Sequence, residues 1–189
     1  GDPVLYDDDQ AFEELESVAD YFLVHNRQIY APLDDSVVTV IHNKPRLIRR
    51  SRGYVPEPIH CKLSGQSPTL AMGSDLKNAF AMNKGSEILV GPHIGDLQNA
   101  STHATLEWTI DRYEELFSIQ PEKIIVDSHP QFFSSHLGER IGKSLQIPVI
   151  PVQHHHAHIA SVMAEHNLEG PVLGIAMDGT GYGPDGTVW

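Results

Sequence analysis

Two short apolar runs in the second half of the sequence constrain the fold more than any other feature. Residues 123–127 and 148–152 are rich in isoleucine and valine, and each run precedes a segment with helical spacing, residues 131–146 and 155–166. Continuously apolar strands are typical of central sheet positions that are covered on both faces. The alternation of strand and helix therefore predicts an α/β fold in which both runs are buried.

Three further strands are expected at residues 69–73, 78–82 and 87–91, and the turn residues between them predict an antiparallel meander. A long helix over residues 96–117 then leads to the first apolar run. This order of elements resembles the ribonuclease-H-like half-domain of actin-like ATPases and sugar kinases, in which two similar halves enclose a nucleotide. The resemblance implies a mixed sheet, and it makes residues 173–178 the first strand of the second half.

The first third of the chain has a different character. Apolar residues recur at intervals of three and four over residues 7–26, which predicts an amphipathic helix, and a β-branched strand follows at residues 37–41. Proline and glycine interrupt residues 56–68 repeatedly. We therefore expect a domain boundary there, with a linker over residues 61–68.

The charge balance limits the partners of the chain. Thirteen Lys and Arg against 25 Asp and Glu give a formal net charge of −12, which disfavours broad binding to nucleic acid or to anionic membranes. The single cysteine, Cys61, excludes an internal disulfide, and no apolar run approaches the roughly 20 residues that span a bilayer. We therefore expect a cytoplasmic protein. The sequence begins without Met and stops in what looks like a strand, which suggests a fragment of a longer chain.

Arginines concentrate in one short stretch of this acidic chain. Arg46, Arg49, Arg50 and Arg52 supply four of the thirteen basic residues. Guanidinium groups bind phosphate or carboxylate through paired hydrogen bonds, which suits a phosphorylated or adenylated substrate. Charge that keeps an edge strand soluble explains the pattern equally well, so the sequence leaves both interpretations open.

Histidines cluster at residues 154, 155, 156 and 158. The spacing of four residues places His154 and His158 on one helical face, near enough to share a cation. The helix follows a strand, so it starts at the carboxyl edge of the sheet, where ligands bind in such folds. Neutral imidazoles at this spacing are a recurring metal arrangement, and the glutamate of the His-Glu-x-x-His metalloprotease motif is absent. The pattern predicts a metal site and argues against peptide hydrolysis.

A glycine-rich segment, residues 178–183, follows the histidine helix. It lacks the Gly-Lys-Ser/Thr ending of a P-loop and the spacing of a dinucleotide-binding loop. Its carboxylate and small residues suit a hairpin held against phosphates, although a tight hairpin without a ligand explains them as well. The turn at residues 73–77 occupies the corresponding place in the first half. Asp178 is therefore a candidate ligand of metal or nucleotide, and Lys77 a candidate phosphate contact.

Six ordered blocks together resemble one known family. They are RRSRGYVPEP (49–58), GSDLKN (73–78), GPHIGDL (91–97), DSHP (127–130), QHHHAH (153–158) and DGTGYG (178–183). Their order and spacing resemble the HypF family of hydrogenase-maturation carbamoyltransferases through nearly the whole chain. The resemblance implies that residues 1–60 are the C-terminal part of a YrdC-like α/β adenylation domain. Residues 69–189 would be the N-terminal half of a carbamoyltransferase domain similar to that of tRNA threonylcarbamoyl transferases.

The resemblance also implies a reaction. Carbamoyl phosphate is cleaved, ATP activates the carbamate as carbamoyl-adenylate with release of pyrophosphate, and the carbamoyl group passes to the C-terminal cysteine of the partner protein HypE. The implied cofactors are ATP and a divalent metal, zinc or iron, with magnesium as a further candidate. The 189 residues alone are expected to lack full activity, because the rest of the nucleotide cleft would lie outside them.

The site residues implied by the resemblance fall into three groups, and no catalytic residue is assigned. The metal ligands are His154, His158 and Asp178. The nucleotide contacts are Gly73, Lys77, Gly179, Thr180 and Gly181. The contacts to carbamoyl-adenylate, or to the domain interface, are Arg49, Arg50 and Arg52.

Three alternatives remain at this point. A tRNA-modifying transferase has the nearest chemistry, but the acidic charge disfavours it, and so does His156, which stands where those relatives have glutamate. A non-catalytic metal-binding module would need only the histidines. A sugar-kinase-like ATPase would need no histidine cluster at all.

Overall fold

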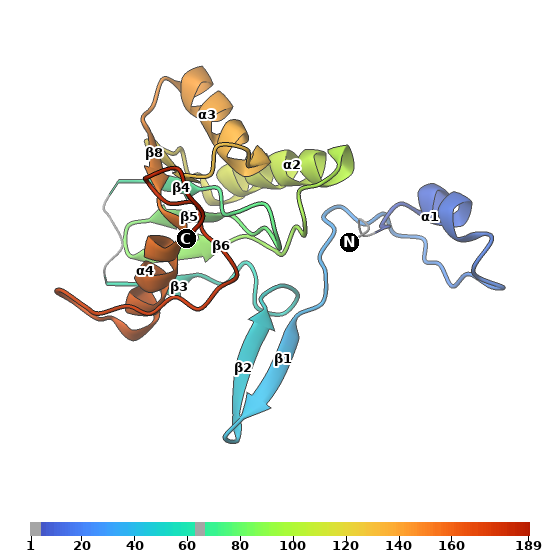
Figure 1. The fold of residues 1–189 in the computed structure, drawn as a ribbon. Helices are drawn as coiled ribbons and strands as arrows, with labels where there is room; N and C mark the ends of the chain where they lie inside the picture. The colour runs from blue at the N-terminus through green and yellow to red at the C-terminus, as the bar shows by residue number, and fades with distance from the viewer. Residues whose placement is uncertain (1–4, 63–66) are drawn as a thin grey trace.

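The computed structural model describes residues 5–62 and 67–189 and has the predicted α/β character (Figure 1). Its elements in chain order are α1 (Asp8–Leu15), β1 (Val37–Ile41), β2 (Lys44–Arg49), β3 (Ile59–His60), β4 (Thr69–Ala71), β5 (Ala81–Lys84), β6 (Glu87–Val90), α2 (Ala100–Phe117), β7 (Lys123–Asp127), α3 (Phe133–Leu145), β8 (Val149–Val152) and α4 (His154–His166). None of the described helices combines the length and hydrophobicity needed to cross a bilayer. Part of the predicted linker, residues 63–66, lies outside the described residues.

Six strands form one mixed sheet in the order β3-β6-β5-β4-β7-β8, while β1 and β2 form a separate hairpin that projects from it (Figure 1). The predicted meander is confirmed, because β5 pairs antiparallel with both β4 and β6. Strand β3, which the sequence pattern does not predict, extends the sheet beyond β6. Strand β7 pairs parallel with β4 and with β8. The carboxyl ends of β4, β7 and β8 therefore meet at one edge of the sheet.

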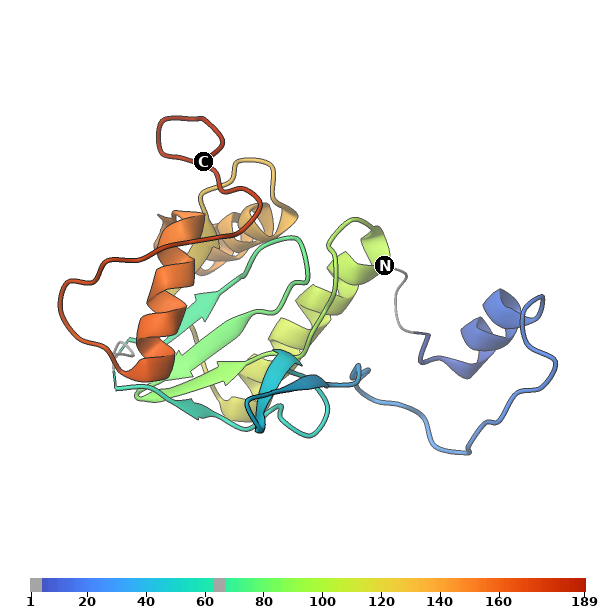
Figure 2. The same ribbon diagram turned by 60° about the horizontal axis from the view of Figure 1, so that its bottom comes forward.

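Strand β7 shows how the sheet divides the molecule into two faces. Ile124 and Val126 are buried in the core that α2 and α3 build against the sheet. Ile125 and Asp127 point to the opposite face, because successive side chains of a strand alternate, and α4 lies on that face (Figures 1 and 2). The predicted burial of both apolar runs on two faces is therefore wrong. One face of β7 lines a cavity, and Ile150 of β8, at the sheet edge, is 43% exposed.

The core lies between the sheet and helices α2 and α3. Its buried members are Leu70, Met72, Phe80, Met82, Leu89, Leu97, Leu106, Ile110, Tyr113, Ile119, Ile124, Val126 and Leu137. Helix α3 approaches the sheet closely at Gly138, where an added Cβ would lie 2.5 Å from Val126 Cγ1. Burial raises the pKa of Tyr113 to about 12, because the charged phenolate is disfavoured away from water.

The helix predicted over residues 7–26 is shorter in the structure. Helix α1 ends at Leu15, and none of its residues is buried. Phe12 packs edge-to-face on Phe22 with 5.0 Å between ring centroids, so the chain after α1 folds back on it. Helices in proteins gain most of their stability by packing an apolar face. The apolar periodicity beyond Leu15 lacks that support, and Leu23 is fully exposed.

The strand predicted at residues 173–178 does not form. Leu173 and Met177 are 95% and 91% exposed, and no strand of the described sheets pairs with this segment. A strand requires a hydrogen-bonded neighbour, which this segment does not have among the described residues. The hairpin expected within residues 178–183 lies further along the chain, where Gly181 pairs with Trp189 and Gly183 with Thr187.

Asp75 ties the turn after β4 to helix α3. Its two carboxylate oxygens accept hydrogen bonds from the backbone N–H groups of Phe133, at 2.8 Å, and Ser134, at 2.9 Å. The N-cap residue of α3, Phe132, offers no side-chain cap of its own. Asp75 therefore satisfies the first donors of a helix 58 residues further along the chain.

Replacing Asp75 with alanine is expected to lower the free energy of unfolding by about 1–2 kcal/mol, because two backbone donors at a helix start lose their acceptor. Asp75→Asn, which keeps one acceptor oxygen, should lose less. Urea denaturation followed by circular dichroism measures both changes as shifts of the midpoint. Equal midpoints for Asp75→Ala and the parent chain would show that the cap adds no stability.

Candidate functional site

Helix α4 begins directly after β8, at the carboxyl edge of the sheet. Its first residue is His154, and His158 follows one turn later, so both rings leave the same face of the helix. The two Nε2 atoms lie 3.1 Å apart. Asp178, from the segment after α4, brings its Oδ2 to 3.4 Å from His154 Nε2 and 3.8 Å from His158 Nε2. Tertiary structure thus gathers the three predicted metal ligands into one cluster.

The spacing of these three atoms fits a metal ion. Ligand atoms bonded at about 2.0 to 2.1 Å to a tetrahedral zinc lie about 3.3 Å apart. The separations of 3.1, 3.4 and 3.8 Å bracket that value. Two imidazoles and one carboxylate suit zinc and iron alike, and a fourth position would stay open for a substrate or water.

Asp127 orients the first of these histidines. It stands at the end of β7 on the α4 side, and its Oδ2 lies 2.8 Å from His154 Nδ1. Its Oδ1 accepts the backbone N–H of His129 at 2.9 Å, and its side chain is only 8% exposed. A carboxylate on Nδ1 keeps the proton there and leaves the lone pair of Nε2 for a metal. Asp127 is not among the site residues predicted from the sequence, although its place at the end of a central strand was a signal for a role.

The two remaining histidines at the start of α4, His155 and His156, differ in burial and in contacts. His155 is half-buried, and its Nε2 lies 3.0 Å from the second oxygen of Asp178. His156 is exposed, and its backbone N–H donates to the capping side chain of Gln153. His155 thus contacts a metal-ligand candidate, whereas His156 faces solvent.

A cavity of about 460 Å³ adjoins the cluster between α4 and the sheet. Its lining includes His154 and His158 of α4, Asp127 of β7, and Gly73 and Ser74 from the turn after β4. Gly73 has a φ of +71°, and a Cβ there would lie 2.5 Å from the carbonyl oxygen of Ala79. Only glycine fits this turn. The structure therefore brings Gly73, a predicted nucleotide contact, to the same cavity as the two histidines.

The remaining predicted nucleotide contacts do not line this cavity. Lys77 is exposed, and its backbone N–H is bonded to Asp96 Oδ1 at 2.7 Å. Gly179 and Thr180 are exposed beside Asp178. Gly181 is buried, and the carbonyl oxygen of Trp189 accepts its backbone N–H at 3.0 Å. The nucleotide role of these four residues stays a prediction.

The arginine segment ties together parts of the N-terminal region. Arg49 forms an ion pair of 2.6 Å with Asp34, and Arg52 one of 3.1 Å with Asp35. Arg50 donates to the carbonyl oxygen of Glu57 at 2.7 Å. Across the described ranges, no hydrogen bond or ion pair joins these three arginines to the histidine cluster. Their contact with carbamoyl-adenylate stays a prediction.

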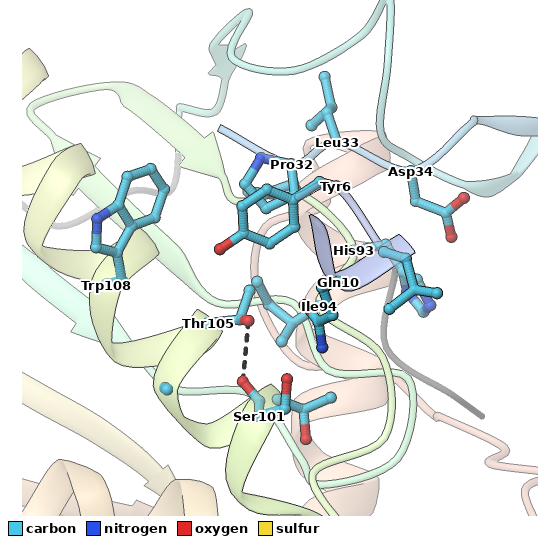
Figure 3. Close-up of a pocket in the computed structure, with 14 residues that line it drawn as sticks. Tyr6, Gln10, Pro32, Leu33, Asp34, His93, Ile94, Ser101, Thr105 and Trp108 are labelled. Atoms are coloured by element: carbon cyan, nitrogen blue, oxygen red, sulfur yellow. Dashed lines mark hydrogen bonds between the residues drawn. The ribbon is translucent and has the colours of Figure 1, made fainter. Parts of the chain in front are cut away.

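A second cavity, of about 300 Å³, lies between the N-terminal region and helix α2 (Figure 3). Tyr6, Pro32 and Trp108 form apolar walls, and Asp34 and His93 stand at one side (Figure 3). The pKa of His93 is lowered, first by burial and next by the positive charge of Arg49, so its ring favours the neutral form. The pattern of residues gave no indication of this cavity, because its walls come from distant segments.

Comparison with known proteins shows which family the chain belongs to. The model of the family described as HypF Kae1-like domain matches residues 64–165. The chain belongs to the HypF family. A second family model, described as Telomere recombination and covering Sua5, YciO and YrdC proteins, matches residues 1–51.

Individual relatives agree with this assignment. The carbamoyltransferase HypF of Synechocystis sp. is 45% identical over 190 residues, and that of Rhizobium leguminosarum bv. viciae is 42% identical over 189 residues. Each alignment covers 100% of this chain and 24% of the relative, so the chain spans about a quarter of the length of these HypF proteins. A solved structure of full-length HypF in the phosphate- and nucleotide-bound form matches with a TM-score of 0.91 and 46% identity, covering 100% of this chain and 29% of that chain. The predicted fold class is thereby confirmed, and the exact domain boundaries stay a prediction.

Proposed function

We propose that the chain supplies one wall of the carbamoyl-transfer site of a HypF enzyme, which uses carbamoyl phosphate and ATP to carbamoylate the C-terminal cysteine of HypE. Water cleaves carbamoyl phosphate to carbamate and phosphate. The carbamate attacks ATP, which gives carbamoyl-adenylate and pyrophosphate. The cysteine thiol then takes the carbamoyl group, and AMP leaves with the thiol proton passing to a base.

The observation that carries the proposal is the cluster of His154, His158 and Asp178 beside a cavity at the carboxyl edge of the sheet. A zinc or iron ion bound there would act as a Lewis acid on a carbonyl or phosphoryl oxygen. The names of the relatives and the nucleotide-bound structure support the carbamoyl and nucleotide parts of the proposal.

The residues of this chain would have distinct tasks in that site. His154 and His158 would hold the metal, Asp127 would fix the ring of His154, and Asp178 would be the third ligand. Gly73 lets the backbone of its turn come close to a phosphate, because no side chain is in the way. Gly179 and Thr180 lie next to Asp178, where they are available to a nucleotide. The YrdC-like residues 1–60 would contribute Arg49, Arg50 and Arg52 to the adenylation site.

A hybrid protein tests the proposal. In it, this chain replaces the matching quarter of the Synechocystis relative. The hybrid protein should carbamoylate HypE when carbamoyl phosphate and ATP are supplied, which mass spectrometry detects as one added carbamoyl group. HypE without its C-terminal cysteine and unmodified tRNA serve as control acceptors, and the 189 residues alone should be inactive. Modification of tRNA in place of HypE would contradict the proposed acceptor. Activity of the isolated 189 residues would contradict the expectation that the second half of the carbamoyltransferase domain is required.

A further inference from the structure

The side chain of Gln153 has only one orientation that satisfies its neighbours. As the N-cap of α4 it accepts the backbone N–H of His156 on Oε1, at 2.9 Å. The amide nitrogen must then face the other way, and it lies 3.2 Å from His155 Nδ1 and 3.4 Å from the carbonyl oxygen of Tyr182. A flipped amide would place its NH₂ group against the N–H of His156, donor against donor.

The orientation of Gln153 fixes the proton of His155. Because the Gln153 amide donates to Nδ1, that nitrogen is an acceptor, and the ring proton sits on Nε2. Nε2 in turn lies 3.0 Å from Asp178 Oδ1 and donates to it. The hydrogen bonds therefore run in one direction, from the cap of α4 through His155 to the carboxylate.

Asp178 depends on this contact for its orientation. It lies in a segment without regular secondary structure, so no helix or strand backbone holds its side chain. With Oδ1 bound to His155, Oδ2 faces the Nε2 atoms of His154 and His158. A freely rotating carboxylate would lose that alignment for most of the time.

The ring of His155 packs directly against the backbone of Gly181. An added Cβ at Gly181 would lie 2.7 Å from both Cε1 and Nε2 of His155. Gly181 is itself fixed by its two hydrogen bonds with Trp189, so the ring would have to move rather than the backbone. The glycine at this position is thus explained by contact with His155.

We propose that His155 is a positioning residue of the metal site: set by Gln153 and seated on Gly181, its Nε2–H holds Asp178 so that the free oxygen faces His154 and His158. The inference rests on the proposed metal-binding function of the cluster. It assigns to His155 an effect on metal affinity that does not require it to touch the metal.

The test is the affinity of the full chain for Zn²⁺, measured by competition with a chromophoric chelator. His155→Phe keeps an aromatic ring next to Gly181 but removes the donor, and zinc affinity should fall about 10- to 100-fold, as is typical when the partner of a metal ligand is lost. His155→Gln can place an amide N–H near the position of Nε2, so it should recover most of the affinity. Gly181→Ala should lower affinity in the same direction as His155→Phe.

His156→Phe is the matched control, because it makes the same substitution one residue further on, at an exposed ring that forms no hydrogen bond with any described residue. It should bind zinc like the parent chain. In a double-mutant cycle, His155→Phe combined with Asp178→Ala should lose no more affinity than Asp178→Ala alone, since His155 acts through Asp178.

The outcomes separate this inference from the proposed function. Parental affinity in His155→Phe, with zinc binding still lost in a His154→Ala, His158→Ala chain, would overturn the positioning role and leave the metal site in place. Additive losses in the cycle would overturn it as well, because His155 would then act independently of Asp178. Failure of the parent chain to bind zinc would overturn the metal site and the positioning role together.

Discussion

Replacing His154 and His158 together with alanine is expected to lower the affinity of the chain for Zn²⁺ by at least about 1,000-fold, equivalent to about 4 kcal/mol of binding free energy. The change removes two of the three clustered ligands and leaves Asp178 alone. A single carboxylate holds a metal weakly, whereas complete zinc sites provide about 10–16 kcal/mol. Chelator competition and metal analysis after dialysis measure the loss.

The same helix offers a matched control for this experiment. His156 and His166 are exposed histidines of α4 that are not among the three candidate metal ligands, and replacing both with alanine changes the same number of residues of the same type. This control should bind zinc like the parent chain. Because alanine is the best helix former, circular dichroism should show α4 intact in both variants. Parental zinc binding by the chain without His154 and His158 would rule out the cluster as a metal site.

Replacing Phe80 with alanine is expected to lower the free energy of unfolding by about 3–5 kcal/mol, the usual cost of removing a fully buried aromatic ring. Phe80 is 0% exposed and packs edge-to-face on Tyr113, with 5.1 Å between ring centroids. Its ring also fills the space next to Gly91, where an added Cβ would lie 2.5 Å away. Total stabilities of small domains are about 5–15 kcal/mol, so the loss brings the fold close to unfolding. The urea midpoint should fall with little change in slope.

Two comparison variants make this result interpretable. Phe80→Leu keeps most of the volume and should cost less than about 1.5 kcal/mol, so it remains measurable even if Phe80→Ala does not fold. Phe12→Ala removes the same ring from α1, where it is 39% exposed, and should shift the midpoint only slightly. A similar shift for Phe12→Ala and Phe80→Ala would show that the core assigned between the sheet and α2 does not dominate stability.

The element pattern of residues 69–166 could be predicted from the sequence because it depends on near neighbours. Strand periodicity, turn residues and helical spacing are set by residues a few positions apart, and the order of the meander, α2, α3 and α4 is as predicted. The limits of two elements differ, because β5 forms at Ala81–Lys84 rather than residues 78–82 and α2 begins at Ala100 rather than residue 96. The pairing of His154 and His158 is also predictable from near neighbours, since one helical turn fixes the distance between them.

The failures of prediction occur where an apolar pattern lacks a partner. Residues 16–26 carry helical spacing, and residues 173–178 carry a strand-like run, yet neither segment packs against the described core. Burial, rather than periodicity, stabilises an element. The arginine segment shows the same limit for charge, because Arg49 and Arg52 form ion pairs with Asp34 and Asp35, a pairing across the β1–β2 hairpin that the local pattern does not predict.

The α/β class and the histidine pair are predictable without a structure, because both follow from local spacing. The completion of the site depends on tertiary contacts. The parallel alignment of β4, β7 and β8 brings Gly73, Asp127 and His154 to one sheet edge, and the chain after α4 returns Asp178 to the same place. The contact of Gln153 with His155 Nδ1 likewise places the ring proton on Nε2, which faces Asp178. Both contacts exist only once the fold has formed. Such contacts join residues far apart in the chain, and their geometry is fixed by packing of the whole domain rather than by any local pattern.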